Sequence, residues 1–271
     1  MHLKRWITGI AALPFLFLMI YRGELLFAVS VSIICFLALC EYFRIVFNTR
    51  GKTISGIILL VGLVVGPIII WAAYKNALDL IIIIVAFNLI SSGLFTFTQF
   101  KSDPFILENL TKQILGIIYI PILLSFLVLI RGGTDGMLWI FSLLFVVFAG
   151  DIGAFYVGSY LGRHKLCPSV SPKKTIEGSI GGLTSNLVVG VLFNYFFLSY
   201  LPLGTSILLF LLIGIAGQAG DLFESALKRS ANIKDSGSLL PGHGGILDRI
   251  DALLFAAPVA YFFKEFIFLT L

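Results

Sequence analysis

Long apolar runs constrain this chain more than any other feature of its sequence. They recur along its whole length, at about 6–21, 25–46, 56–74, 77–97, 114–130, 137–160, 178–198, 206–229 and 248–269. A helix needs about 20 such residues to cross a bilayer, and a segment in lipid must satisfy its own backbone hydrogen bonds. The sequence therefore predicts an all-α, polytopic integral membrane protein with about nine transmembrane helices.

The composition excludes most other classes of protein. The 271 residues are 59% hydrophobic and 12% charged, whereas a soluble domain is about half apolar and a quarter charged. A water-soluble globule, a disordered chain and a secreted disulfide scaffold are excluded, the last because the chain has only three cysteines. No small-residue cleavage site follows the first apolar run, so we expect this run to be a retained span.

Basic residues indicate the orientation. If the N-terminus is cytosolic, 15 of the 19 Lys and Arg residues lie in cytosolic segments, and the far side keeps Arg22, Lys75, Arg131 and Lys264. Such an excess marks cytoplasmic loops, so we expect the N-terminus to be cytosolic. The net charge of +5 then favours anionic lipid headgroups, not a nucleic-acid partner.

The two halves of the chain differ in their chemistry. Residues 1–135 are expected to form a scaffold of five spans, whose few acids, Glu41 among them, lie near span ends as solvated side chains. Residues 136–271 are expected to form four catalytic spans with cytosolic loops at 163–177 and 230–247. Gly178, Gly181 and Gly182 permit close helix packing within or between subunits, so a homodimer stays open.

Four carboxylates lie inside the predicted spans of the second half. Asp151 lies about 16 Å inside the sixth span and Asp221 about 12 Å inside the eighth, at the helical rise of 1.5 Å per residue. Asp248 and Asp251 open the ninth span on one helical face. Each would cost about 2.5–3.5 kcal/mol if it faced lipid, so we expect a polar cavity open to the cytosolic side.

A cation is the simplest partner for such a cluster. Carboxylates that converge repel one another unless a cation joins them, and hard oxygen ligands suit Mg²⁺. Asp248 and Asp251 have an alternative role, because acids near a helix N-terminus complement the helix dipole.

The loop before the ninth span carries the features of an anion site. Asp221, Glu224, Ser225 and Lys228 form a polar stripe on a helix end, and a Gly-rich turn at 241–245 leads directly into a helix start. Basic side chains can bind phosphate oxygens there: Lys228, Arg229, Lys234 and Arg249. His243 could be a turn residue, a phosphate donor or a proton relay; phosphate contact is preferred, because a phosphomonoester needs little deprotonation.

The loop at 163–177 repeats this basic, turn-rich character. It contains Lys173 and Lys174, followed by Thr175 and Glu177 just before a helix. The lysines could also anchor the chain at the cytosolic surface, and Thr175 and Glu177 could cap the helix.

Together these residues resemble a known family. The run of Ser225, Lys228, Arg229, Lys234, Asp235, Gly237, Leu240, Pro241, His243, Gly244, Gly245, Ile246, Asp248, Arg249, Ile250 and Asp251 resembles the phosphatidate cytidylyltransferase (CDP-diacylglycerol synthase) signature, with every fixed position filled. Asp151-x-x-Ala154-Phe155 and the stretch from Ser171 to Gly178 also resemble that family, over about 148–255 in all. Ser159 departs from it, because many relatives carry a basic residue there.

The resemblance implies that CTP and phosphatidate give CDP-diacylglycerol and pyrophosphate, with Mg²⁺ required. Asp221, Asp248 and Asp251 would hold the Mg²⁺, with a second cation left open and Asp151 as a further member or an orienting group. The basic residues Lys228, Arg229, Lys234, His243 and Arg249 would neutralise CTP and pyrophosphate, and Lys173 and Lys174 would steer the lipid phosphate or the nucleotide. The remaining predicted substrate contacts are Ser171, Thr175, Glu177, Ser225, Asp235, Gly242, Gly244 and Gly245.

Two other functions use similar parts. A CTP-dependent lipid kinase of the dolichol kinase type would transfer the γ-phosphate and release CDP. An ion-coupled transporter would use the submerged acids as a cation path, without consuming CTP.

Overall fold

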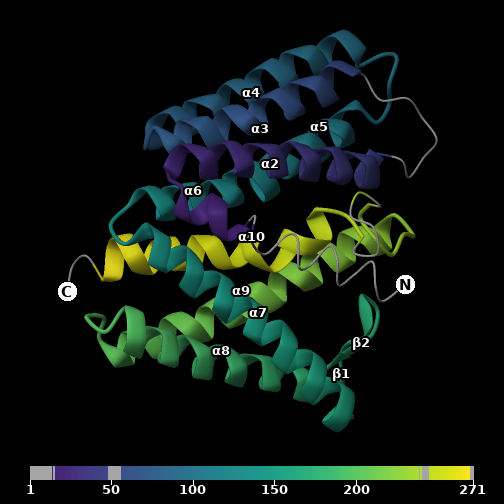
Figure 1. Ribbon diagram of the computed structural model, residues 1–271. Coiled ribbons are helices and arrows are strands. Elements are labelled where there is room, and N and C mark those ends of the chain that lie inside the picture. The colour runs from purple at the N-terminus through teal and green to yellow at the C-terminus, as the bar shows by residue number, and fades with distance from the viewer. Residues whose placement is uncertain (1–13, 15, 48–55, 238, 240–243, 269–271) are drawn as a thin grey trace. The chain divides into compact units, whose positions relative to one another are not determined.

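The computed structural model describes residues 14, 16–47, 56–237, 239 and 244–268, and it is mostly helical (Figure 1). The chain divides into two compact units. Unit 1 comprises Met1–Gly132 and Ala231–Asp248, and unit 2 comprises Gly133–Ser230 and Arg249–Leu271. The loop that precedes the last helix thus groups with the first half of the chain. The predicted division into a scaffold half and a catalytic half at 135/136 stays a prediction, because a division into compact units gives no information on function.

Unit 1 is built from helices packed side by side. These are α2 (Glu24–Phe47), α3 (Gly56–Tyr74), α4 (Leu78–Gln99), α5 (Ile106–Ile117) and α6 (Leu123–Gly132), with the π-helical turn η2 (Ile118–Ile122) joining the last two. Pro121 lies in that turn. A proline has no backbone N–H to donate, and a π-turn is one way a helix continues past it. Ile106–Gly132 therefore forms one continuous apolar span.

Two polar links tie unit 1 together inside its apolar core. The hydroxyl of Tyr42 on α2 donates to the carbonyl oxygen of Lys112 on α5, at 3.0 Å. The amides of Asn88 on α4 and Gln113 on α5 hydrogen-bond to each other, with 2.8 Å between Nε2 of Gln113 and Oδ1 of Asn88. Both amides are buried, so the pair satisfies groups that would otherwise be costly in an apolar interior.

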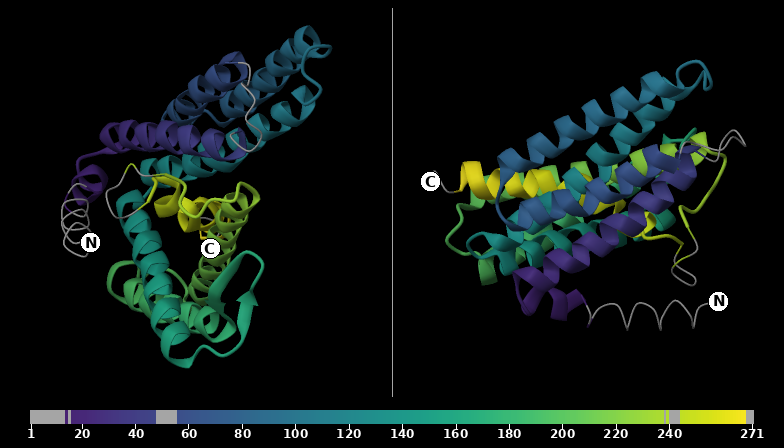
Figure 2. Two further views of the ribbon diagram at one scale, coloured as in Figure 1. Left: turned by 90° about the vertical axis from the view of Figure 1, so that its right-hand side faces the viewer. Right: turned by 90° about the horizontal axis from the view of Figure 1, so that it is seen from above.

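Unit 2 contains α7 (Gly136–Leu161), β1 (Lys165–Cys167), β2 (Ser171–Thr175), α8 (Ile176–Phe197), α9 (Leu203–Ser230) and most of α10 (Leu247–Phe262), which ends in the π-helical turn η3 (Phe263–Ile267). The two strands are antiparallel, with Lys165 opposite Thr175 and Cys167 opposite Ser171. They form a short hairpin beyond the end of α7 (Figure 2). The prediction of an all-α fold is thus confirmed for the helices and wrong for this segment.

Small residues let α7 and α8 pack at backbone distance. A Cβ atom on Gly178 would lie 2.9 Å from the carbonyl oxygen of Ala154, and one on Gly182 would lie 2.9 Å from that of Gly150. Any larger side chain would force the helices apart, because neighbouring backbone cannot yield as a flexible side chain can. The sequence left open whether these glycines pack within or between subunits, and the structure places Gly178 and Gly182 at a contact within the chain.

Six described helices are long and apolar enough to cross a membrane: Glu24–Phe47, Leu78–Gln99, Ile106–Gly132, Gly136–Leu161, Ile176–Phe197 and Leu203–Ser230. Ile58–Tyr74 is apolar but shorter, and α10 has 16 residues. The prediction of a polytopic helical membrane protein is therefore confirmed in its coarse form. Nine spans and a cytosolic cavity stay predictions, and most of the first predicted span lies outside the described residues.

Candidate active site

Three carboxylates from three different helices interact within unit 2. Asp151 comes from α7, Asp221 from α9 and Asp251 from α10. Asp221 repels both of the others, and Asp151 also repels Asp251. Gly220 explains the close approach of α9 and α10, because a Cβ atom there would collide with the carbonyl oxygen of Asp251. The structure therefore brings together three of the four acids that the sequence singled out.

Cations surround this acidic group. The ammonium of Lys174, on β2, lies 2.5 Å from Oδ2 of Asp221, and both side chains are about one-third exposed or less, at 27% and 35%. Lys174 and Arg249 also attract Asp151, and Lys228 attracts Asp251. The predicted basic residues thus partly neutralise the predicted acidic ones, which lowers the repulsion that such a cluster would otherwise suffer.

The two lysines of the hairpin differ. Lys173 is exposed, whereas Lys174 is turned to Asp221 and its ammonium is buried. Alternation of side chains along a strand explains the difference, since neighbours on β2 point to opposite faces. Ser171, at the start of β2, is half-buried.

Thr175 and Glu177 fasten the base of the hairpin. Thr175 Oγ1 accepts a hydrogen bond from the backbone N–H of Gly178 at 3.1 Å, which caps α8. The Glu177 carboxylate accepts from the backbone N–H of Arg163 at 3.0 Å and lies 2.5 Å from Nδ1 of His164. The capping alternative considered from the sequence is thus confirmed for Thr175, whereas Glu177 accepts from the residues before β1. Direct substrate contact by these two residues stays a prediction.

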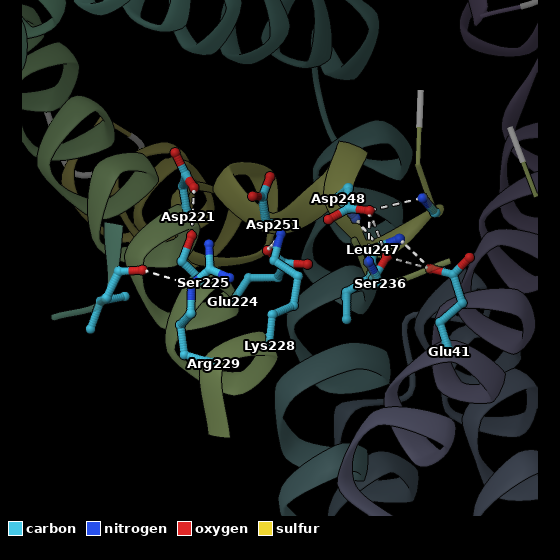
Figure 3. A network of polar contacts seen from close by, with 12 residues as sticks. Glu41, Asp221, Glu224, Ser225, Lys228, Arg229, Ser236, Leu247, Asp248 and Asp251 are labelled. Carbon is cyan, nitrogen blue, oxygen red and sulfur yellow. Dashed lines mark hydrogen bonds and ion pairs between the residues drawn. The ribbon is translucent and has the colours of Figure 1, made fainter. Parts of the chain in front are cut away.

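The polar stripe on α9 is confirmed, and its members are paired. Glu224 is fully buried and forms an ion pair with Lys228, one turn along. Ser225 Oγ donates to Oδ1 of Asp221 at 3.5 Å. Arg229 is exposed and its Nε donates to the carbonyl oxygen of Val170 at 3.2 Å, so α9 also holds the turn of the hairpin (Figure 3).

The fourth acid, Asp248, organises the turn before α10, in unit 1. Its Oδ2 accepts from the backbone N–H of Gly245 at 2.8 Å and from that of Ser236 at 2.9 Å. Gly244 has φ +80°, and a Cβ atom there would lie 2.6 Å from Oδ2 of Asp248. Only glycine fits both that backbone conformation and that space. Gly244 and Gly245 thus form a turn around Asp248, as predicted, while 241–243 of the predicted turn lie outside the described residues.

Glu41 on α2 lies on the other side of the same turn. Its Oε2 accepts from the backbone N–H of Leu247 at 2.9 Å, and Oε1 accepts from that of Ile246 at 3.0 Å (Figure 3). Glu41 is 6% exposed, so its interpretation as a solvated span-end acid is wrong. Sequence reasoning also missed its partner Ser236, and no local pattern marks either residue.

The other predicted site residues are exposed or lie outside the described residues. Lys234, Asp235 and Arg249 are exposed. Gly242 and His243 lie outside the described residues, with the rest of 240–243. Their predicted contacts with nucleotide phosphates stay predictions.

The carboxylates of the candidate site are suited to Mg²⁺ only in part. In the part of the chain that the structure describes, no group of three or more His, Cys, Asp or Glu side chains is placed to hold a metal ion. Mg²⁺ usually needs only one or two protein carboxylates, because substrate phosphates and water complete its shell. Asp221 already holds a cation, the ammonium of Lys174, and Asp251 lies within electrostatic range of it. Oδ2 of Asp248 accepts hydrogen bonds from the turn. If Asp248 is a third ligand of Mg²⁺, as predicted, its Oδ1 atom would have to bind the ion.

Comparison with known proteins identifies the family. The sequence model of a family described as "Cytidylyltransferase family" matches residues 3–267 of this chain. The chain is 34% identical, over 96% of both chains, to a protein of Bacillus subtilis (strain 168) named phosphatidate cytidylyltransferase. It is 30% identical to the protein of that name from Staphylococcus aureus (strain COL), over 94% of this chain and 96% of the relative. It is 38% identical to the one from Staphylococcus haemolyticus (strain JCSC1435), over 61% of this chain and 63% of the relative. The match spans the scaffold helices as well as the signature, and the chain therefore belongs to the cytidylyltransferase family.

Proposed function

We propose that this chain is a phosphatidate cytidylyltransferase, which joins CTP and phosphatidate to give CDP-diacylglycerol and pyrophosphate. Relatives at 30–34% identity over nearly the whole chain carry that name. The observation that carries the proposal is the Lys174–Asp221 pair inside a group of three mutually repelling carboxylates. Such a group is suited to cations, and both substrates of this reaction are polyanions.

Each cationic group has a task in this reaction. Lys174 would exchange its contact with Asp221 for a phosphate oxygen when the substrates arrive, because an anionic phosphate competes for the ammonium. Arg249, Lys234 and the exposed Lys173 would screen the charge of CTP and of the departing pyrophosphate. Lys228 stays with the buried Glu224, which makes it a positioning residue for the end of α9 in this account.

Asp221 and Asp251, with Asp248 as a third candidate, would hold Mg²⁺. When bound, Mg²⁺ supplies positive charge against the triphosphate. The protein's own contribution is positioning and charge stabilisation: a lipid phosphate oxygen attacks the α-phosphorus in line, the bond from that phosphorus to the bridging oxygen breaks, and pyrophosphate leaves. The attacking phosphate is already anionic, so no general base is required.

The membrane determines where this reaction can occur. Phosphatidate is held in the bilayer and CTP is in the cytosol, so the acids should open to the cytosolic surface of a bacterial inner membrane. The excess of Lys and Arg on one side of the predicted spans supports that orientation.

Product analysis tests the proposal. The full chain, purified in detergent, is incubated with phosphatidate and CTP, with and without Mg²⁺. We expect pyrophosphate and CDP-diacylglycerol in equal amounts, only with Mg²⁺ present. Release of CDP would indicate a lipid kinase instead, and absence of CTP consumption would contradict both.

A further inference from the structure

The strongest unassigned feature is a charged clamp on α2 that holds the turn before α10. Glu41 and Arg44 lie three residues apart, one helical turn along α2. Glu41 accepts from the turn, and the guanidinium of Arg44 donates to the carbonyl oxygen of Ser236. A helix of the scaffold half thus contacts the signature run directly, within unit 1.

The Glu41 carboxylate uses both oxygens. Oε2 accepts from Leu247 N at 2.9 Å and lies 2.9 Å from Ser236 Oγ, while Oε1 accepts from Ile246 N at 3.0 Å. The first backbone N–H groups of a helix have no partner within that helix. Glu41 supplies acceptors for two such groups at the start of α10, and a charged acceptor makes these hydrogen bonds stronger than neutral ones.

The hydroxyl of Ser236 connects Glu41 to Asp248. It lies 2.9 Å from Oε2 of Glu41 and 2.9 Å from Oδ2 of Asp248, and Ser236 is fully buried. The positions of the two carboxylates are therefore coupled through one short side chain. A displacement of Glu41 would move an acid of the predicted metal set without touching any substrate.

Two glycines lie close against the Glu41 carboxylate. A Cβ atom on Gly237 would collide with Oε1 of Glu41, and one on Gly245 would collide with Oε2. The two glycines of the signature run thus let the Glu41 carboxylate approach closely, and Gly245 also leaves room for the hydroxyl of Ser236. Glu41 itself is 6% exposed, and a charged group is retained at such a position only when it is well paired.

We propose that Glu41, with Arg44, is a positioning residue for nucleotide binding, acting through Ser236 and the 244–248 turn on Asp248. The inference rests on the proposed function, in which Asp248 is a candidate for holding Mg²⁺, and on the predicted contact of Gly244 and Gly245 with the substrates. Some side chains act only by orienting others that bind a metal or substrate. Removal of such a side chain typically lowers affinity or activity about 10- to 100-fold. Loss of Glu41 should therefore weaken the use of CTP and leave the use of phosphatidate unchanged.

Glu41→Gln is the variant that tests this, with Glu108→Gln as the matched control. A glutamine keeps the size of the side chain, but its NH₂ group would face a backbone N–H, so one donor loses its acceptor. Glu108 is also a glutamate of unit 1, and its carboxylate pairs with Lys112 at 3.0 Å. For the full chain in detergent, we expect Glu41→Gln to raise the KM for CTP about 10- to 100-fold. The KM for phosphatidate and both KM values of Glu108→Gln should remain as in the wild type.

Hydrogen–deuterium exchange provides a readout that does not depend on activity. Peptides that contain Gly245, Ile246 and Leu247 should exchange faster in Glu41→Gln than in the wild type, and peptides from α3, α4 and α8 should not. If the wild-type chain does not convert CTP, the proposed function fails, while exchange still tests the clamp. If the wild type is active and Glu41→Gln shows both normal exchange and a normal KM for CTP, the clamp is refuted.

A purely structural role predicts a different pattern. In that case Glu41→Gln would lower the melting temperature and the active fraction, with both KM values unchanged, which would overturn the proposal. If Glu41→Gln fails to fold, Glu41→Asp and Ser236→Ala replace it. Both should raise the KM for CTP by smaller factors in the same direction, and an unchanged KM for CTP in both would overturn the proposal.

Discussion

The ammonium of Lys174 lies 2.5 Å from Oδ2 of Asp221, so the basic hairpin is joined directly to an acid of α9. The pair links the two features that the sequence singled out separately, a basic loop and submerged acids. In the proposed reaction the lysine is released to a phosphate when the acid receives a divalent cation.

Lys174→Gln should impair the enzyme far more than Lys173→Gln. The first change removes the partner of Asp221 and a phosphate-binding charge, and we expect kcat/KM to fall about 100-fold. The second removes an exposed charge, for which a change below about threefold is expected. Steady-state pyrophosphate release measures both variants. Equal losses in the two would show that the lysines act only through the general charge of the surface.

Asp221→Asn should abolish turnover while the protein stays folded. The substitution keeps the size of the side chain, but it removes the charge that attracts Lys174 and, in this account, Mg²⁺. Repulsion of Asp151 and Asp251 is relieved at the same time, so the melting temperature in detergent should not fall. A variant with near-normal turnover would exclude Asp221 as a metal ligand.

Gly244→Ala should destabilise the turn before α10. A side chain at φ +80° is strained, at a cost of about 1–2 kcal/mol, and its Cβ would press on Asp248. We expect a lower melting temperature and a lower rate with CTP. Gly204→Ala on α9 is the control, because no atom lies within 4 Å of a Cβ atom there. Its stability should be unchanged or slightly higher, and the turn assignment would be wrong if the two variants behaved alike.

Glu177→Gln should loosen the hairpin without altering the folded core. The carboxylate holds the backbone N–H of Arg163 and the ring of His164, and both residues are exposed. Limited trypsin digestion should cut faster after Arg163 and Lys165, with the melting temperature nearly unchanged. Unaltered cleavage together with a higher KM for a substrate would instead favour direct substrate contact by Glu177.

The helices could be predicted because hydropathy acts locally. The run predicted at 137–160 corresponds to α7 (Gly136–Leu161), and the last run begins one residue after the start of α10 at Leu247. The span predicted from residue 114 begins earlier, at Ile106. Glu108 and Lys112 interrupt the apolar run there, yet they pair with each other at 3.0 Å on one face of the helix. Charge lowered the local hydropathy without ending the helix.

The site could be predicted only where its residues are close in sequence. The stripe on α9 follows from helical spacing, and Gly244 follows from turn chemistry. The hairpin was missed because its strands have three and five residues and together carry three lysines and one proline, which give no alternating apolar pattern. Glu41 was missed because it lies 206 positions from Leu247, the residue whose N–H it accepts. Only the folded chain brings such a pair together.

The fate of each phosphorus of CTP tests the central claim most directly. CTP labelled at the α-phosphorus and CTP labelled at the γ-phosphorus are supplied in parallel to the purified chain with phosphatidate and Mg²⁺. We predict that the α-label enters the lipid, that the γ-label leaves in pyrophosphate, and that Asp221→Asn transfers neither. Entry of the γ-label into the lipid would contradict the account, as would labelling by Asp221→Asn at the wild-type rate.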